Sequence, residues 1–159
     1  MQRPCLENYL LFETLQILYH LTGILEFVST TSAIEYALTV LNVENIVICG
    51  HSNCGGCNAL WNENTLAKAP HTRKWLELAG PVKEQIEKHY GVEISDPLGK
   101  EWVTEQFNVV EQMKHIFSYP GVKEKYDNKT IRIPGWYYII ETGDIYNYNF
   151  KTKSSELIL

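Results

Sequence analysis

The feature that most constrains the fold is a short run of β-branched and apolar residues, Ile46 to Cys49. Its continuous apolarity is typical of a strand buried on both faces. Before it, Ser32 to Glu35 has the form of a capping box, and apolar residues then recur at helical spacing, which predicts a helix over 32–41. A helix followed by a buried strand predicts an α/β fold around a mainly parallel β-sheet flanked by helices.

The rest of the chain is predicted to add three helices and then two strands. Apolar spacing and Gly/Pro signals predict helices over 72–79, 81–90 and 100–117, then a strand over 130–140, a turn over 141–144 and a second strand over 145–150. In an open α/β sheet, ligands bind at the carboxyl ends of the strands. The loop that follows Cys49 is therefore the first place to look for function.

Composition limits the classes of partner. The chain has 159 residues, of which 45% are hydrophobic, enough for one globular core. The net charge is −5 without a basic cluster, so we expect neither nucleic acid nor an anionic membrane as a partner. Glutamates interrupt the apolar first 27 residues and no small-residue cleavage site follows, so we expect no signal peptide, no membrane span and a cytoplasmic location.

The loop itself carries the chemistry. The segment Ile48 to Cys57 reads ICGHSNCGGC and holds one histidine and three of the four cysteines. Imidazole and thiolate are preferred zinc ligands, so His51 and Cys54 are candidate metal ligands. The spacing alone leaves a second interpretation open, in which His51 bonds to the backbone and Cys54 is merely buried.

The segment 29–60, STTSAIEYALTVLNVENIVICGHSNCGGCNAL, resembles the β-class carbonic anhydrases. The resemblance continues through Trp75, the 103–113 helix and the ending Gly135 to Tyr148, so that it covers about Ser29 to Phe150. It implies a Zn²⁺ enzyme, a lyase that reversibly hydrates carbon dioxide to bicarbonate and a proton.

The resemblance assigns roles only to matching positions. His51 and Cys54 correspond to zinc ligands of the family, whereas Cys49 and Cys57 do not, and we interpret these two as core packing. The family also implies a homodimer or higher homo-oligomer, in which some Tyr and Trp side chains of 135–148 could contribute to an interface. Of the remaining histidines, we expect His20, His71, His89 and His115 to be solvated.

One part of the family pattern has no counterpart. The family's third protein ligand lies upstream in a Cys-x-Asp-Ser-Arg motif, which this sequence lacks together with the aspartate and arginine. Cys5 is the only cysteine before the strand, and it has none of those neighbours. We therefore assign no catalytic residue beyond the two metal ligands.

The segment Cys5 to Leu21, CLENYLLFETLQILYHL, suggests a reason. Codons can be chosen for it so that the same nucleotides, read from the third base, encode PGELFIIRNVANIVPP, which has the form of the family's second strand. We therefore hypothesise that residues 1–28 include an out-of-frame product and that 29–159 form the anhydrase-like domain. On this hypothesis the first two strands of the sheet are missing.

Two other functions are compatible with the sequence. Cys54 and Cys57 form a C-x-x-C motif after a strand, as in thioredoxin-like thiol-disulfide oxidoreductases. Alternatively, the chain is a truncated or frame-disrupted family member that is catalytically impaired or inactive, because two protein ligands leave half of a zinc tetrahedron unfilled.

Overall fold

A computed structural model describes residues 9–13, 28–90 and 96–159. In chain order the helices and strands are β1 (Tyr9–Glu13), α1 (Val28–Thr39), β2 (Asn45–His51), α2 (Gly55–Ala59), η3 (Glu63–Leu66), α3 (Pro70–Leu76), η4 (Glu77–Ala79), α4 (Gly80–Tyr90), α5 (Pro97–His115), η6 (Ile116–Ser118), α6 (Val122–Asp127), β3 (Gly135–Tyr138), β4 (Ile145–Asn149) and β5 (Ser154–Leu157). This is the predicted α/β class.

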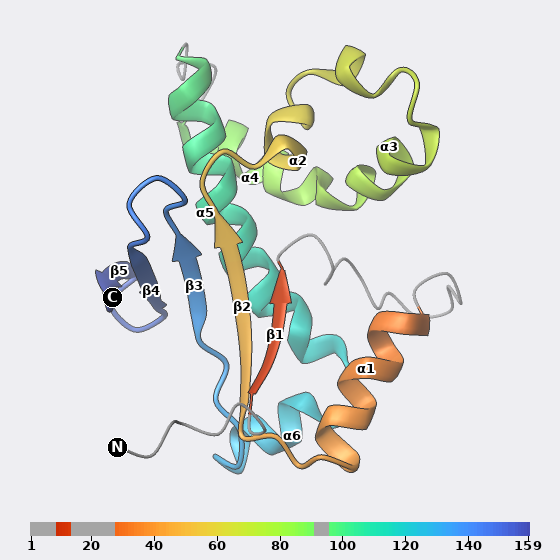
Figure 1. Cartoon of the computed structure of the whole chain (residues 1–159), viewed down its shortest axis with the longest axis vertical. Helices are drawn as coiled ribbons and strands as arrows, with labels where there is room; N and C mark the ends of the chain where they lie inside the picture. The colour runs from red at the N-terminus through yellow and green to blue at the C-terminus, as the bar shows by residue number, and fades with distance from the viewer. Residues whose placement is uncertain (1–8, 14–27, 91–95) are drawn as a thin grey trace.

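The strands form one five-stranded sheet in the order β1-β2-β3-β4-β5. The first three strands run parallel, as predicted for the part around β2, and β4 and β5 extend the sheet antiparallel. Figure 1 shows α5 running along the sheet, with α2, α3 and α4 gathered beyond the carboxyl end of β2. The loop after β2 therefore lies where the sheet meets these helices.

Strand β1 lies in the segment that we expected to add nothing to the sheet. Tyr9 to Glu13 pair in register with Asn45 to Cys49 of β2. Main-chain pairing needs only the N–H and C=O groups that every extended non-proline segment carries, whatever its side chains are. The sheet thus has one strand before α1 where the sequence predicted none.

The core lies between the sheet and the helices α1, α5 and α6. Ile46, Val47 and Ile48 of β2 are fully buried, as the apolar run predicts. Ile46 and Ile48 belong with Ile34 and Leu38 of α1 to one buried cluster, whose other members include residues of α5, η6 and α6. Val47 alternates with them along the strand, so it is buried on the opposite face of the sheet. The strand that carries the candidate site is therefore held from both sides.

The starts of α1 and α5 differ most from their predicted positions. α1 begins at Val28, so Ser32 lies inside the helix and does not cap it. α5 begins at Pro97, where the Asp96 side chain accepts hydrogen bonds from the N–H groups of Leu98 and Gly99 at 3.3 and 3.0 Å. An aspartate followed by proline is a strong start signal, and it places the start of α5 three residues before the predicted start at residue 100.

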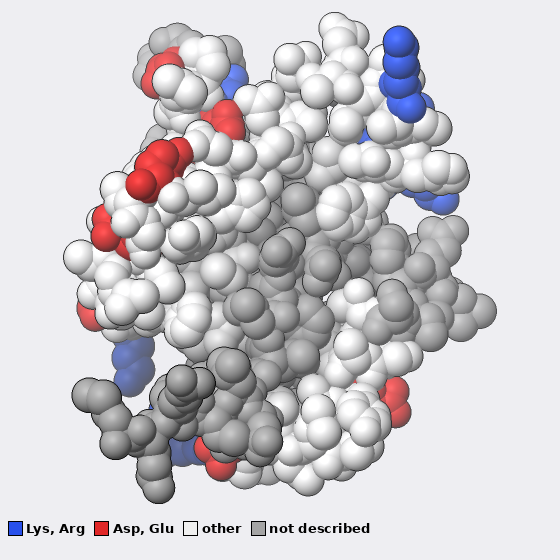
Figure 2. Space-filling model, viewed as in Figure 1, with Lys and Arg blue, Asp and Glu red and all other residues white. Residues whose placement is uncertain are grey.

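No helix within residues 28–90 and 96–159 is both long enough and apolar enough to cross a membrane. On the face shown in Figure 2, lysine and arginine side chains lie apart from one another around the rim and form no continuous basic surface.

Candidate metal centre

His51 ends β2 and is followed by a tight loop. Asn53 has φ +56, in the left-handed region that asparagine tolerates better than most residues, and Cys54 then returns to an extended conformation as the N-cap of α2. Nδ1 of His51 lies 2.9 Å from the Ser52 carbonyl oxygen. Because a carbonyl oxygen can only accept, Nδ1 of a neutral ring donates here, which leaves the Nε2 lone pair for a metal.

The loop is tied to the end of β3 by Ser52 and Asn53. The Ser52 hydroxyl donates to Oε2 of Glu141 at 2.9 Å and accepts from the N–H of Ile140 at 2.9 Å. The Asn53 side-chain amide donates to Oε1 of the same carboxylate. Hydrogen bonds from its own backbone N–H and from Ser52 and Asn53 lower the pKa of Glu141. These contacts hold the loop in one shape.

A second carboxylate, Glu105 of α5, lies beneath the loop with only 3% of its surface exposed. Its Oε1 accepts from the Cys54 backbone N–H at 2.7 Å, and its Oε2 accepts from the Tyr137 hydroxyl at 2.5 Å. Burial raises the pKa of Glu105, and these two hydrogen bonds oppose the shift. Burial and the bond to Glu105 also raise the pKa of Tyr137. Glu105 thus joins the loop, α5 and β3.

Cys54 and Cys57 are buried together, with 4% and 2% of their surfaces exposed. The Cys57 thiol donates a hydrogen bond to the Cys54 sulfur, and this bond is the largest cause that lowers the Cys54 pKa to about 6 against the opposing effect of burial. Backbone N–H groups of Cys57 and Gly56 lower it further. The hydrogen bond to Cys54 and burial raise the pKa of Cys57. The lowered pKa favours the thiolate form of Cys54, which is the form that binds zinc.

Cys57 is buried, as we predicted from the sequence, but it also contacts Cys54, which is the candidate metal ligand. Cys49 is partly buried on β2, and its thiol donates to the Gly50 carbonyl oxygen at 3.5 Å. Neither contact was visible in the sequence, because side-chain hydrogen bonds across a loop leave no periodic signal.

The side chains of the site are of the types that zinc prefers, but the described residues supply fewer protein ligands than a catalytic zinc site uses. His51 and Cys54 supply an imidazole and a thiolate, yet no group of three His, Cys, Asp or Glu side chains among those that the structure describes could hold a metal ion. Catalytic zinc sites use three protein ligands and one open position. A third protein donor would have to come from outside the described residues, and Cys5 lies there.

Two cavities flank α5. One of about 420 Å³ lies beside the loop, and its lining includes Ser52, Asn53, Glu101, Glu105 and Glu141. This opening is acidic and therefore suits a neutral small molecule better than an anion.

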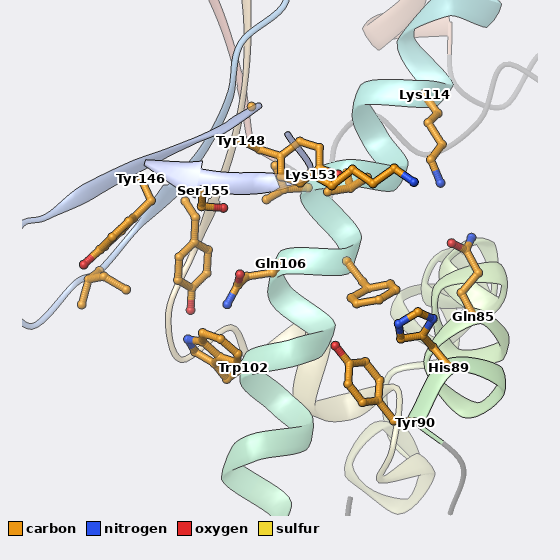
Figure 3. A pocket seen from close by; sticks show the side chains of 16 residues that line it. Gln85, His89, Tyr90, Trp102, Gln106, Lys114, Tyr146, Tyr148, Lys153 and Ser155 are labelled. Atoms are coloured by element: carbon orange, nitrogen blue, oxygen red, sulfur yellow. The ribbon is translucent and has the colours of Figure 1, made fainter. Parts of the chain in front are cut away.

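The other cavity, of about 700 Å³, lies between α4, α5 and the strands β3 to β5. Figure 3 shows aromatic side chains, including Trp102, Tyr146 and Tyr148, around it, with Lys114 and Lys153 at one rim. His51 and Cys54 are not among its lining residues.

The other histidines differ in their surroundings. His71 and His89 are exposed, as predicted, while His20 lies outside the described residues. His115 corrects the prediction of a solvated side chain. Its side chain is only 16% exposed, and its Nε2 lies 3.1 Å from Oε1 of Glu111, because one turn of α5 brings residues 111 and 115 to the same face.

Solved structures share this architecture. A structure described as the β-carbonic anhydrase CcaA superimposes with a TM-score of 0.78 at 25% identity, covering 89% of this chain and 61% of that one. One of two tetrameric β-carbonic anhydrases from Sordaria macrospora superimposes with a TM-score of 0.63 at 27% identity, covering 76% of this chain and 59% of that one.

The comparison by sequence agrees with the comparison of structures. The family model described as carbonic anhydrase matches residues 18–145, which is most of the chain. The chain belongs to the β-carbonic anhydrase family. This membership confirms the resemblance identified from the loop and the strands around it.

Two curated carbonic anhydrases show what share of a relative's length this chain spans. The protein from Helicobacter pylori strain 26695 is 40% identical over 141 residues, which are 86% of this chain and 63% of that protein. The protein from Synechococcus elongatus is 33% identical over 115 residues, 72% of this chain and 42% of that protein. This β-carbonic anhydrase chain thus spans less than two thirds of these relatives.

Proposed function

We propose that this chain's function is the reversible hydration of carbon dioxide to bicarbonate and a proton, with Zn²⁺ held by His51 and Cys54. The observation that supports it is the state of these two side chains, a histidine with Nε2 left open and a cysteine whose pKa is lowered to about 6. When bound, zinc would supply Lewis-acid activation of water.

The chain's own residues would keep the two ligands in place. The Glu141 bonds from Ser52 and Asn53 fix the loop, and Glu105 holds the backbone N–H of Cys54. Such supporting contacts orient metal ligands and strengthen metal binding. The acidic lining of the adjacent cavity is compatible with access of neutral carbon dioxide and favours departure of anionic bicarbonate.

A second candidate is a catalytically impaired or inactive family member. It is favoured by the absence of a third ligand among the described residues and by the lack of a Cys-x-Asp-Ser-Arg motif in the sequence. The thiol-disulfide oxidoreductase has less support, because family membership accounts for His51 and the glycines as well as for the C-x-x-C spacing.

Zinc content and hydration, measured on the same preparation, separate the two candidates. The proposed enzyme contains one zinc per chain and accelerates carbon dioxide hydration in a stopped-flow indicator assay, and His51→Ala abolishes both. His71→Ala, an exposed matched control, leaves both unchanged. A chain that holds zinc but shows no acceleration, or that holds none, would support the impaired alternative.

We also propose that the protein acts as a homodimer or higher homo-oligomer and that it is cytoplasmic. The related enzymes from Sordaria macrospora are described as tetrameric, which supports an assembly. Sedimentation-equilibrium centrifugation of the purified chain tests the assembly, and a purely monomeric species at micromolar concentration would contradict it.

A further inference from the structure

The cavity of about 700 Å³ between α4, α5 and the strands β3 to β5 takes no part in the proposed function. We propose that it binds a small aromatic carboxylate, whose ring lies among the aromatic side chains and whose carboxylate lies at the lysine rim. Ligand sites commonly measure about 300–1,000 Å³ and combine a mostly apolar lining with a few polar groups. This cavity has that size and that kind of lining.

Aromatic side chains from three elements surround the cavity. Tyr90 ends α4, Trp102 and Phe107 lie on α5, and Tyr146 and Tyr148 lie on β4. Trp102 is 54% exposed and Tyr90 is 43% exposed. Large apolar side chains that gather at a surface and stay in contact with water commonly mark a binding site. A flat aromatic ring placed in the cavity would cover these side chains and stack against them.

Contacts within the walls hold the rings in place before a ligand binds. The rings of Tyr90 and Phe107 meet edge to face at a centroid distance of 6.0 Å, and the His89 ring lies 5.0 Å from that of Tyr90. On the strand β4, the Tyr148 ring meets that of Phe150 at 5.3 Å. Walls that are ordered in advance reduce the entropy lost on binding.

The charged side chains of the cavity are lysines. Among the described residues that line it there is no aspartate or glutamate, although the whole chain has a net charge of −5. Figure 3 shows Lys114 of α5 and Lys153 of the β4–β5 turn at one rim. Lys114 pairs with Glu111 at 2.8 Å, whereas Lys153 forms no ion pair with a described residue. Because one of the two lysines is already paired, the rim suits the single charge of a carboxylate.

The smaller cavity beside the loop is less suited to this ligand. The two cavities share Trp102, Tyr137 and Ile139, but the smaller one is lined by the three glutamates described above. Like charges repel, so a carboxylate is directed away from the smaller cavity and towards the larger one.

Isothermal titration of the purified full chain with 2-naphthoate tests the inference. The control ligand is 2-naphthalenemethanol, which has the same ring system and no charge. We expect one 2-naphthoate per chain and weaker binding of the alcohol. Trp102→Ala should weaken binding of both ligands about tenfold, because it removes a stacking partner. Its matched control is Tyr36→Ala, which removes an aromatic side chain of similar exposure from α1 and should leave binding unchanged.

A second variant tests the lysine rim. Lys153→Gln should weaken binding of 2-naphthoate about threefold, as the loss of one exposed ion pair would, and should leave binding of the alcohol unchanged. Lys151→Gln removes an exposed lysine of the same turn that does not line the cavity, so it should change the binding of neither ligand.

Several results would overturn the inference. It is wrong if 2-naphthoate does not bind, if the alcohol binds as tightly, or if Trp102→Ala or Lys153→Gln behaves like its matched control. It is also wrong if the number of ligands per chain falls as the chain concentration rises, because a second copy of the chain then covers the cavity.

The inference does not rest on the proposed function, and its test is separable from that of the metal site. His51 and Cys54 do not line this cavity, so His51→Ala should bind 2-naphthoate as tightly as wild type. Loss of binding in that variant would place the carboxylate at the metal and overturn the inference. A chain that neither holds zinc nor hydrates carbon dioxide would still bind 2-naphthoate, and a chain that does both but does not bind it would overturn only this inference.

Discussion

Among single residues, Glu105 connects the loop of the candidate site to the strand β3. It is buried, and each of its carboxylate oxygens accepts one hydrogen bond, from Cys54 and from Tyr137. No sequence pattern indicated this role, because a glutamate on an amphipathic helix is usually a solvated residue.

Replacement of Glu105 by alanine should destabilise the fold. It leaves a buried N–H group and a buried hydroxyl without their acceptor, which typically costs about 1–3 kcal/mol for each unsatisfied group. Urea unfolding of Glu105→Ala measures the loss. The matched control is Glu101→Ala, whose carboxylate accepts from Asn58 at an exposed position, and which should change the free energy of unfolding by less than about 0.5 kcal/mol. Equal losses would contradict the structural role of Glu105.

At the scale of elements, patterns within one segment were predictable and contacts between segments were not. The apolar run of β2 identified that strand, since burial leaves a continuous apolar run in the sequence. Apolar spacing also identified α5, but the most buried face of this helix is largely polar and contains Thr104, Glu105, Asn108, Val109, Gln112 and Met113. In contrast, α2 is five residues long and begins with two glycines, so this segment is too short to show an apolar period. β5 is fully exposed and polar, so that it is recognisable only by its pairing with β4.

The contact between α5 and β3 makes a prediction about Gly135. A Cβ at this position would overlap the side chain of Met113, which is buried in the core. Overpacking of this kind costs about 1–3 kcal/mol, so Gly135→Ala should lower the midpoint of urea unfolding. In Gly80→Ala an added Cβ meets nothing within 4 Å, and the helical φ of −48° suits alanine, so that variant should be neutral or more stable. A Gly135→Ala protein as stable as wild type would contradict the close approach of the two elements.

The C-terminal end of α5 predicts a pH effect. Burial lowers the pKa of His115 from its ordinary value of 6.5, with Glu111 opposing and Lys114 assisting the shift. The unfolded chain therefore binds a proton at pH values where the folded chain does not, so stability should fall as pH drops below about 6.5. His115→Gln should flatten the dependence of the unfolding free energy on pH between about 7 and 5. The exposed His71→Gln should leave it unchanged, and a slope equal to wild type in His115→Gln would contradict the assignment.

At the scale of the whole molecule, the chain combines a complete β2 loop with an N-terminal segment that departs from the family pattern. We propose that residues 1–28 include an out-of-frame product that precedes the domain 29–159. The presence of β1 is compatible with this, since it pairs through its main chain. Sequencing of the gene over codons 5–21 should reveal PGELFIIRNVANIVPP in the neighbouring frame. Nucleotides that cannot encode that strand would refute the proposal.

The central claim is that the loop after β2 holds the metal through His51 and Cys54. Calorimetric titration of the metal-free chain with zinc tests it most directly, because binding is measured without reliance on turnover. We predict one zinc per chain for wild type, at least tenfold weaker binding for His51→Ala and for Cys54→Ser, and unchanged binding for His71→Ala. Zinc binding that is the same in all four proteins would contradict the claim.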